Sequence, residues 1–170
     1  ALYTATDGEV QYSADSGDSW DYVPFTNDIR IGAFGATGFV EFEGHWFALG
    51  PRQLVLVTDE GGQLASDGLP DGNTDWDRVR SAASFAGSLY AGTGRSGVYR
   101  LDEVGGTFVQ DGLDGLEVNA LCTAGNTLFA GTDQGLYKAN VDVIPGVDPE
   151  GMAFSRWADL KRNALLPNYP

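Results

Sequence analysis

The side chains best suited to contact a ligand are charged and aromatic residues on the short turns and links between expected strands. They are Asp7, Arg52, Arg95, Asp133, Asp75 and Trp76. Loops held by a rigid scaffold commonly carry binding residues. The link at residues 71–77 places Trp76 among three carboxylates, although capping of the next strand is an alternative role for it. These residues predict ligand binding, whereas no metal site and no cofactor is predicted.

Few residues are suited to nucleophilic or acid–base chemistry. His45 is the only histidine, so a Ser/His/Asp triad or a His-rich metal site would have to use it. Its position beside an expected strand start favours a solvent-facing turn residue. Cys122 is the only cysteine, and its place on an expected inner strand favours a buried small hydrophobe over a nucleophile. We therefore predict no catalytic residue.

The strands that position these residues recur about every forty residues. An apolar doublet opens a strand at Leu2-Tyr3, Trp46-Phe47, Leu89-Tyr90 and Leu128-Phe129, in steps of 44, 43 and 39 residues. A period of this length is typical of propellers and solenoids. The third unit shows four expected strands separated by Gly-containing turns, at residues 79–85, 88–92, 97–101 and 107–110. No sustained helical period is present, so an all-β fold with almost no helix is predicted.

One octapeptide, Ser13-Ala14-Asp15-Ser16-Gly17-Asp18-Ser19-Trp20, resembles the Asp-box, the hairpin signature of BNR-type repeats. Degenerate copies occupy residues 57–64 and 101–108. The residues given a structural role in these hairpins are Ser13, Asp15, Gly17, Ser19, Trp20, Asp59, Gly61, Leu64, Glu103, Gly105, Thr107 and Phe108. We expect Asp15 to accept hydrogen bonds from its own turn and Gly17 to be left-handed. Trp20, Leu64 and Phe108 are expected to be buried between sheets.

The repeat and the resemblance together predict a single β-propeller domain over residues 1–170, with about four blades of four antiparallel strands. The blades span about 27–70, 71–116 and 117–160, and the first joins residues 1–26 to a closing strand at 161–170. The closing strand is expected because Arg162-Asn163-Ala164-Leu165 matches Val118-Asn119-Ala120-Leu121. Two alternatives stay open. Two chains could complete a larger ring as a homodimer, or the sequence could be a piece of a longer propeller.

The charge excludes some classes of partner. The chain has 24 acidic and 10 basic residues and a net charge of −14, which argues against binding nucleic acid or anionic lipid through a basic surface. No apolar run is long enough for a membrane span. An acidic, lysine-poor surface is typical of proteins from high-salt habitats, and calcium binding at acidic loops is the alternative interpretation. The compartment stays open, although Asp-box propellers are often secreted or at the cell surface.

The expected function is a non-enzymatic propeller that binds a protein, or acts as a scaffold, through the loops of one ring face. A sialidase-like glycoside hydrolase is one alternative, for which the available residues are Arg30, Arg52, Arg80, Arg95, Tyr3, Tyr90 and Tyr99. The tyrosines recur at equivalent repeat positions, and the segment at 29–32 lacks the proline of the sialidase Arg-Ile-Pro motif. A carbohydrate-binding module is the other alternative, with Trp76 or Trp157 as a stacking platform.

Overall fold

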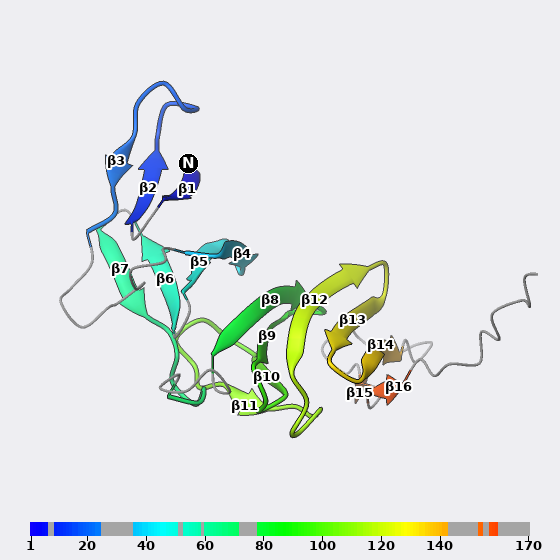
Figure 1. The fold of residues 1–170 in the computed structure, drawn as a ribbon. Coiled ribbons are helices and arrows are strands. Elements are labelled where there is room, and N and C mark those ends of the chain that lie inside the picture. The colour runs from blue at the N-terminus through cyan, green and yellow to red at the C-terminus, as the bar shows by residue number, and fades with distance from the viewer. Residues whose placement is uncertain are drawn as a thin grey trace, which may run out of the picture.

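A computed structural model describes residues 1–6, 9–24, 36–50, 53–58, 60–71, 78–142, 153–154 and 157–159. Every regular element in these segments is a β-strand, and the strands form four sheets in which all pairings are antiparallel (Figure 1). Consecutive strands pair with one another in sheets 1 to 3, and in sheet 4 from β12 to β15, whereas β16 pairs with β14. The predicted all-β class is therefore confirmed.

The four sheets follow one another along the chain. Sheet 1 contains β1 (Leu2–Thr6), β2 (Glu9–Ser13) and β3 (Asp21–Tyr22). Sheet 2 contains β4 (Gly38–Phe42), β5 (His45–Leu49), β6 (Leu54–Thr58) and β7 (Gly61–Leu64). Sheet 3 contains β8 (Val79–Phe85), β9 (Ser88–Thr93), β10 (Val98–Leu101) and β11 (Val109–Gln110). Sheet 4 contains β12 (Val118–Ala124), β13 (Thr127–Thr132), β14 (Gly135–Asp142), β15 (Ala153–Phe154) and β16 (Ala158–Asp159).

The strand register repeats with the sequence. The first residue of each apolar doublet pairs with the neighbouring strand at one equivalent position, as Leu2↔Ser13, Trp46↔Val57, Leu89↔Leu101 and Leu128↔Ala139. Because side chains alternate between the two faces of a strand, this shared register puts each doublet's second residue on the opposite face in every sheet. The repeat predicted from the doublets is thus also a repeat of register.

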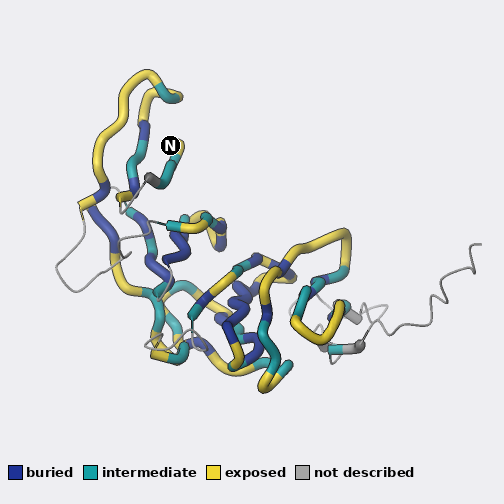
Figure 2. The backbone as a smooth tube through the Cα atoms, in the orientation of Figure 1, coloured by how far each residue is buried: buried dark blue, intermediate teal, exposed yellow. Residues whose placement is uncertain are grey.

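Successive sheets pack face to face, and three apolar clusters lie between them in the described part of the chain (Figure 2). We call the face of a sheet that packs on the next sheet in the chain its forward face, and the opposite one its backward face. The forward faces contribute Tyr3, Phe47 and Tyr90 to these clusters, and the backward faces contribute Trp46, Leu89 and Leu128. The alternation of strand side chains therefore supplies both halves of every junction.

A short tail after the outermost strand reinforces each junction. The backbone carbonyl of Pro24 accepts a hydrogen bond at 2.9 Å from β7 of the next sheet. A Cβ atom on Gly68 would lie 2.1 Å from the carbonyl oxygen of Phe108, which shows how closely the second tail approaches sheet 3. A Cβ atom on Gly112 would lie 3.0 Å from Trp157 Cδ1, between β15 and β16. Pro24, Gly68 and Gly112 are spaced by 44 residues, so these contacts follow the repeat.

The four sheets follow an open arc. The inner strand β8 packs against the inner strands β4 and β12. Sheet 1 and sheet 4 lie at opposite ends of the arc and are well separated in Figure 1. The predicted ring of four blades is therefore not present in the described part of the chain. The closing strand predicted at 161–170 lies outside the described residues.

The prediction that Cys122 is buried was wrong, because the thiol lies on an exposed part of β12. Cys122 pairs with Phe129, and the equivalent inner-strand residues Val40 and Ala83 pair with Phe47 and Tyr90. Val40 and Ala83 are each 9% exposed because another sheet covers them. Among the described residues no sheet covers the forward face of sheet 4, which leaves the thiol in solvent.

Candidate binding face

Two of the predicted ligand-binding residues lie in the described part of the chain. Arg95 is exposed on the turn between β9 and β10, and Asp133 is exposed on the equivalent turn between β13 and β14. The others, Asp7, Arg52, Asp75 and Trp76, lie outside the described residues. Arg95 and Asp133 come from adjacent sheets. Their role in binding stays a prediction.

Both turns are held by a threonine at the end of the preceding strand. Thr93 Oγ1 donates a hydrogen bond to the carbonyl of Gly97 at 2.8 Å, and Thr132 Oγ1 donates one to the carbonyl of Gly135 at 2.9 Å. Each hydroxyl also accepts a hydrogen bond from a backbone N–H of its own turn, at 3.0 Å and 3.1 Å. The side chains on these turns are therefore presented from a fixed backbone.

Each turn is also tied to the link that precedes its sheet. Gly94 N–H donates to the carbonyl of Arg78 at 2.9 Å, and Asp133 N–H donates to the carbonyl of Glu117 at 3.1 Å. The carboxylate of Asp133 returns a contact by accepting the N–H of Glu117 at 3.1 Å. The turns of sheets 3 and 4 therefore lie beside the links that precede those sheets. We call the surface formed by residues 93–97, 114–117 and 132–135 the turn face.

A polar cluster beside the turn face joins the inner strands of sheets 3 and 4. Arg80 Nη1 lies 2.7 Å from Glu117 Oε1 and donates to Asn119 Oδ1 at 3.0 Å. Both partners of the ion pair are partly exposed, so the pair contributes at most about 1 kcal/mol. The ion pair instead holds the link at Glu117 in place beside β8. Arg80 and Asn119 are 39 residues apart, the same step that separates the third and fourth doublets.

Sequence reasoning missed the polar contacts around the Arg95 turn. Gln110 Nε2 donates to the carbonyl of Ser96 at 3.0 Å and also to Asp114 Oδ1. Gln110 and Asp114 follow the turn only after an intervening hairpin. The one sequence signal for their position is the 44-residue spacing of the tails that follow the outermost strands. The turn face thus carries exposed Arg95 as well as the exposed acids Asp114 and Asp133, so it is mixed in charge even though the chain is strongly acidic.

The hairpin that follows β2 shows the hydrogen bonds expected of an Asp-box-like sequence. Asp15 Oδ1 accepts from Ser19 N–H at 2.9 Å, Asp15 Oδ2 accepts from Ser19 Oγ at 2.5 Å, and Ser13 Oγ donates to Asp15 Oδ1 at 2.7 Å. The hydrogen bonds from the hydroxyl and N–H of Ser19, followed by that from Ser13, hold the pKa of Asp15 well below its ordinary value. Gly17 has φ of 103°, the left-handed region predicted for it. These are local roles within one turn.

The third-unit copy keeps the shape of this hairpin but not its contacts. Thr107 Oγ1 donates to Asp67 Oδ2 at 2.8 Å, on the tail of the preceding sheet. Glu103 contributes its backbone carbonyl, which accepts from Gly106 N–H at 3.1 Å. Gly105 has φ of 83°, equivalent to the left-handed Gly17. A link to the neighbouring sheet thus replaces the serine–aspartate contact of the first unit.

The prediction that all three hairpin aromatic or apolar residues are buried was correct only for Phe108, which is 3% exposed. Trp20 is 40% exposed, although its indole N–H donates to the carbonyl of Gly17 at 3.1 Å. The tail of sheet 2 covers Phe108, since the backbone carbonyl of Asp67 accepts a hydrogen bond from the N–H of Phe108 at 2.8 Å. In the described part of the chain no tail of another sheet covers Trp20 in this way.

Leu64, which is 54% exposed, was assigned to the wrong register. β6 and β7 pair at Thr58↔Gly61, so only two residues separate these strands, and one of them, Asp59, lies outside the described residues. Leu64 consequently pairs with Val55, the position that Gln110 occupies opposite Tyr99 in sheet 3. The shorter turn moves Leu64 two residues beyond the place of Phe108. This position is at the exposed outer edge of the sheet.

The tyrosines considered for hydrolysis lie in packing positions. Tyr90 is 1% exposed, and Tyr3, Tyr99 and Tyr137 are partly buried against the apolar clusters. These tyrosines, which recur at equivalent repeat positions, therefore contribute to the apolar clusters. His45 is exposed, as predicted, and its Nδ1 lies 2.8 Å from the carbonyl oxygen of Glu43. Arg30 and Arg52 lie outside the described residues.

Two ionisable groups at the outer part of the junction between sheets 3 and 4 have shifted pKa values. Burial, and then the charge of Asp111, raises the pKa of the Tyr90 hydroxyl. Burial raises the pKa of Asp111, while the Arg100 guanidinium opposes that shift. Asp102 adds to this cluster by accepting from Ser88 Oγ at 2.8 Å and by pairing with Arg100 Nε at 3.0 Å. Burial is the largest cause of the pKa shift of both groups.

Trp157, predicted as a stacking platform, is partly buried and packs against the cluster between sheets 3 and 4. Gly112 lies directly against its ring. A ring whose surface is partly used for packing offers less area for a sugar, and the stacking role of Trp157 stays a prediction.

Within the described segments no group of three or more histidine, cysteine or acidic side chains is arranged to hold a metal ion. Those segments also contain no helix with the length and apolar character required to span a membrane. Neither a protein-family model nor a curated protein sequence matches this chain.

Proposed function

We propose that the four sheets are consecutive blades of an Asp-box-type β-propeller and that the chain is a non-enzymatic module that binds a protein through its turn face. The repeated register, the face-to-face junctions and the Asp15 hairpin support the propeller assignment. A propeller presents the loops of all its blades on two sides of the ring, and function commonly resides in those loops.

The observation that carries the binding proposal is the double attachment of the turns. Each turn is fixed by a threonine hydroxyl and by a hydrogen bond to the preceding link. Arg95, Asp114 and Asp133 are exposed on this frame, so opposite charges are presented at fixed positions. A partner that binds such a surface need not order it, which lowers the entropic cost of association. Fixed mixed charge also favours the correct register of a protein partner.

The test compares partner capture by matched surface variants. The face variant combines Arg95→Glu with Gln134→Arg, because both residues are exposed on the turn face. The control carries Glu103→Arg, an exposed change on the hairpin after β10. Proteins cross-linked by the wild-type chain in an extract of its own cells would be quantified by mass spectrometry. We expect a defined set to fall at least tenfold with the face variant and to persist with the control.

The same preparations separate the alternatives. Binding to a glycan panel that survives the face variant would favour a carbohydrate-binding module. Turnover of a fluorogenic sialoside by the wild-type chain would favour a hydrolase. A set of captured proteins that is unchanged in the face variant would contradict binding through the turn face.

A further inference from the structure

The forward face of sheet 4 is apolar and uncovered among the described residues. Leu136 pairs with Gly131, and the equivalent residues of sheets 1, 2 and 3 are Val10, Leu54 and Val98. Those three are 0% exposed, whereas Leu136 is 46% exposed. The position is apolar in every repeat, so its exposure in sheet 4 reflects a missing neighbour.

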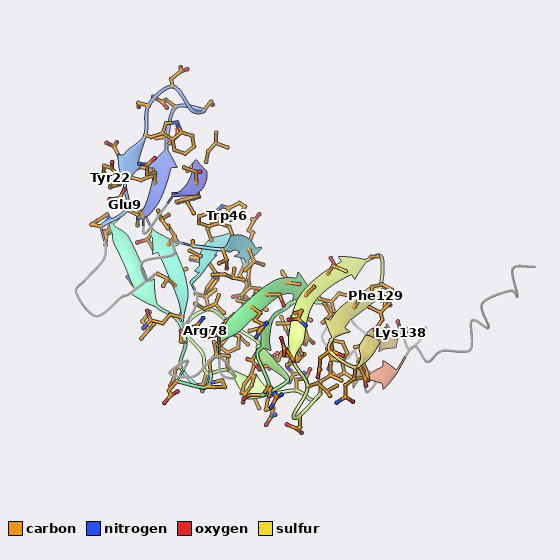
Figure 3. All side chains as sticks on the ribbon, in the orientation of Figure 1. Glu9, Tyr22, Trp46, Arg78, Phe129 and Lys138 are labelled. Carbon is orange, nitrogen blue, oxygen red and sulfur yellow. The ribbon has the colours of Figure 1, made fainter. Side chains whose placement is uncertain are left out.

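Cys122, Phe129 and Lys138 extend this surface. Phe129 pairs with Cys122 on one side and with Lys138 on the other, so the three side chains lie on the same face. Figure 3 shows Phe129 and Lys138 on sheet 4, at the end of the arc opposite Tyr22 of β3. The equivalents of Phe129 in sheets 2 and 3, Phe47 and Tyr90, are each 1% exposed because they are covered.

Among the residues that the structure describes, the backward face of sheet 1 is the other uncovered half of a junction. Leu2 is 48% exposed, while its equivalents Leu89 and Leu128 are 0% exposed. A Cβ atom on Gly17 would lie 3.8 Å from Leu2 Cδ1 and 3.9 Å from Trp20 Cζ2, so the leucine and the indole flank one glycine. Trp20 is 40% exposed. Leu2 and Trp20 therefore both lie beside Gly17 and both are exposed.

We propose that two copies of this chain associate head to tail, with the forward face of sheet 4 in each copy packed on the backward face of sheet 1 in the other. These two faces are the complementary halves of a junction that the chain already forms three times between its own sheets. A second copy brings the matching half with the same register.

Geometry and charge also favour a second copy. The described sheets follow an open arc with its uncovered faces at the two ends (Figure 1). A head-to-tail interface repeated twice about a two-fold axis closes two arcs into one ring. Eight sheets lie within the range of known propellers. Lys138 on the forward face would approach the acidic hairpin of sheet 1, which carries Asp15 and Asp18. This proposal does not depend on the turn face or on its partner.

The first readout is molar mass by light scattering across a wide range of protein concentration. We expect a mass of about twice the 18.1 kDa of the chain. Each copy carries a net charge of −14, so screening by added salt should strengthen the dimer. Leu136→Arg and Leu2→Arg should each halve the mass, because both side chains would be buried in the interface. Val109→Arg is the control, since Val109 is 61% exposed on sheet 3 within the array and should leave the dimer intact.

The second readout is the reactivity of Cys122 toward a thiol reagent. The thiol should be protected in the dimer and reactive in Leu136→Arg, whose fold is verified by far-ultraviolet circular dichroism. A monomer at every concentration and salt level would overturn the proposal. So would a dimer in which Cys122 stays reactive and both arginine variants keep the mass, or an assembly of more than two copies.

Discussion

Phe108 and Trp20 occupy the same place in two repeats, 88 residues apart, yet only Phe108 is buried. Truncation of each to alanine therefore tests whether the inter-sheet junction, or the hairpin itself, stabilises this position. Phe108 is 3% exposed and is covered by the tail at Asp67 and Gly68. We expect Phe108→Ala to lower the free energy of unfolding by about 3 to 5 kcal/mol, the range for large aromatics in packed cores.

Trp20→Ala should cost less even though tryptophan is the larger residue. The Trp20 side chain keeps 40% of its surface in solvent, and its removal forfeits one hydrogen bond to Gly17 within the same turn. Less apolar area returns to water, so we expect a loss of about 1 to 2 kcal/mol.

Urea unfolding followed by far-ultraviolet circular dichroism measures both losses without relying on tryptophan fluorescence. A lower midpoint with an unchanged m-value would identify a change in stability alone. The measurement belongs at low protein concentration, because association would add stability to the wild type. Equal losses, or a loss below about 1 kcal/mol for Phe108→Ala, would refute the assigned junction.

Three further predictions follow from the repeat and its charge. Gly68→Ala should destabilise the protein more than Gly87→Ala in the same unfolding assay. Both glycines have positive φ, at 82° and 79°, but only at Gly68 would a Cβ atom lie 2.1 Å from the Phe108 carbonyl oxygen. Gly87→Ala should therefore cost only the backbone strain of a left-handed alanine, about 1 to 2 kcal/mol, and equal losses would contradict the tail contact. Because the pKa of Asp15 is lowered in the folded state, its hydrogen bonds stabilise the fold fully above about pH 4 and less as the pH falls toward the folded-state pKa. The melting temperatures of wild type and Asp15→Asn should therefore differ most near neutral pH and converge in acid. A difference that grows in acid would contradict the lowered pKa. The melting temperature should rise smoothly with molar NaCl or KCl because salt screens the net charge of −14, whereas a gain that saturates at sub-millimolar calcium would indicate a specific ion site.

The features that could be predicted from the sequence are those that depend on nearby residues. The apolar doublets located one equivalent strand in each repeat, because an apolar pair at a strand start can pack on both faces of a sheet. The Asp15 hairpin was predictable because serine and aspartate side chains satisfy backbone groups a few residues away. The turns that carry Arg95 and Asp133 were located correctly for the same reason. Their attachment to Arg78 and Glu117 follows from the position of the links beside them.

The errors arose where a residue depends on segments distant in sequence. Leu64 was misplaced because the turn between β6 and β7 is shorter than the turn between β10 and β11. The strand pairing therefore shifts by two residues, although Leu64 and Phe108 keep the 44-residue spacing of the repeat. The contacts of Gln110 with Ser96 and Asp114 depend on where the chain passes after the outermost strand. A repeat alignment contains neither kind of information.

The sequence by itself determined the all-β class, the repeated units and their turn chemistry, because strand alternation and glycine-containing turns act over a few residues. Only the tertiary structure decided which equivalent residues are buried. Val98 and Leu136 are both apolar and share one position in the register, yet their exposed fractions are 0% and 46%. The physical reason is that strand side chains leave water only when a second sheet packs on them, and the presence of that neighbour is not encoded in the repeat that contains the residue.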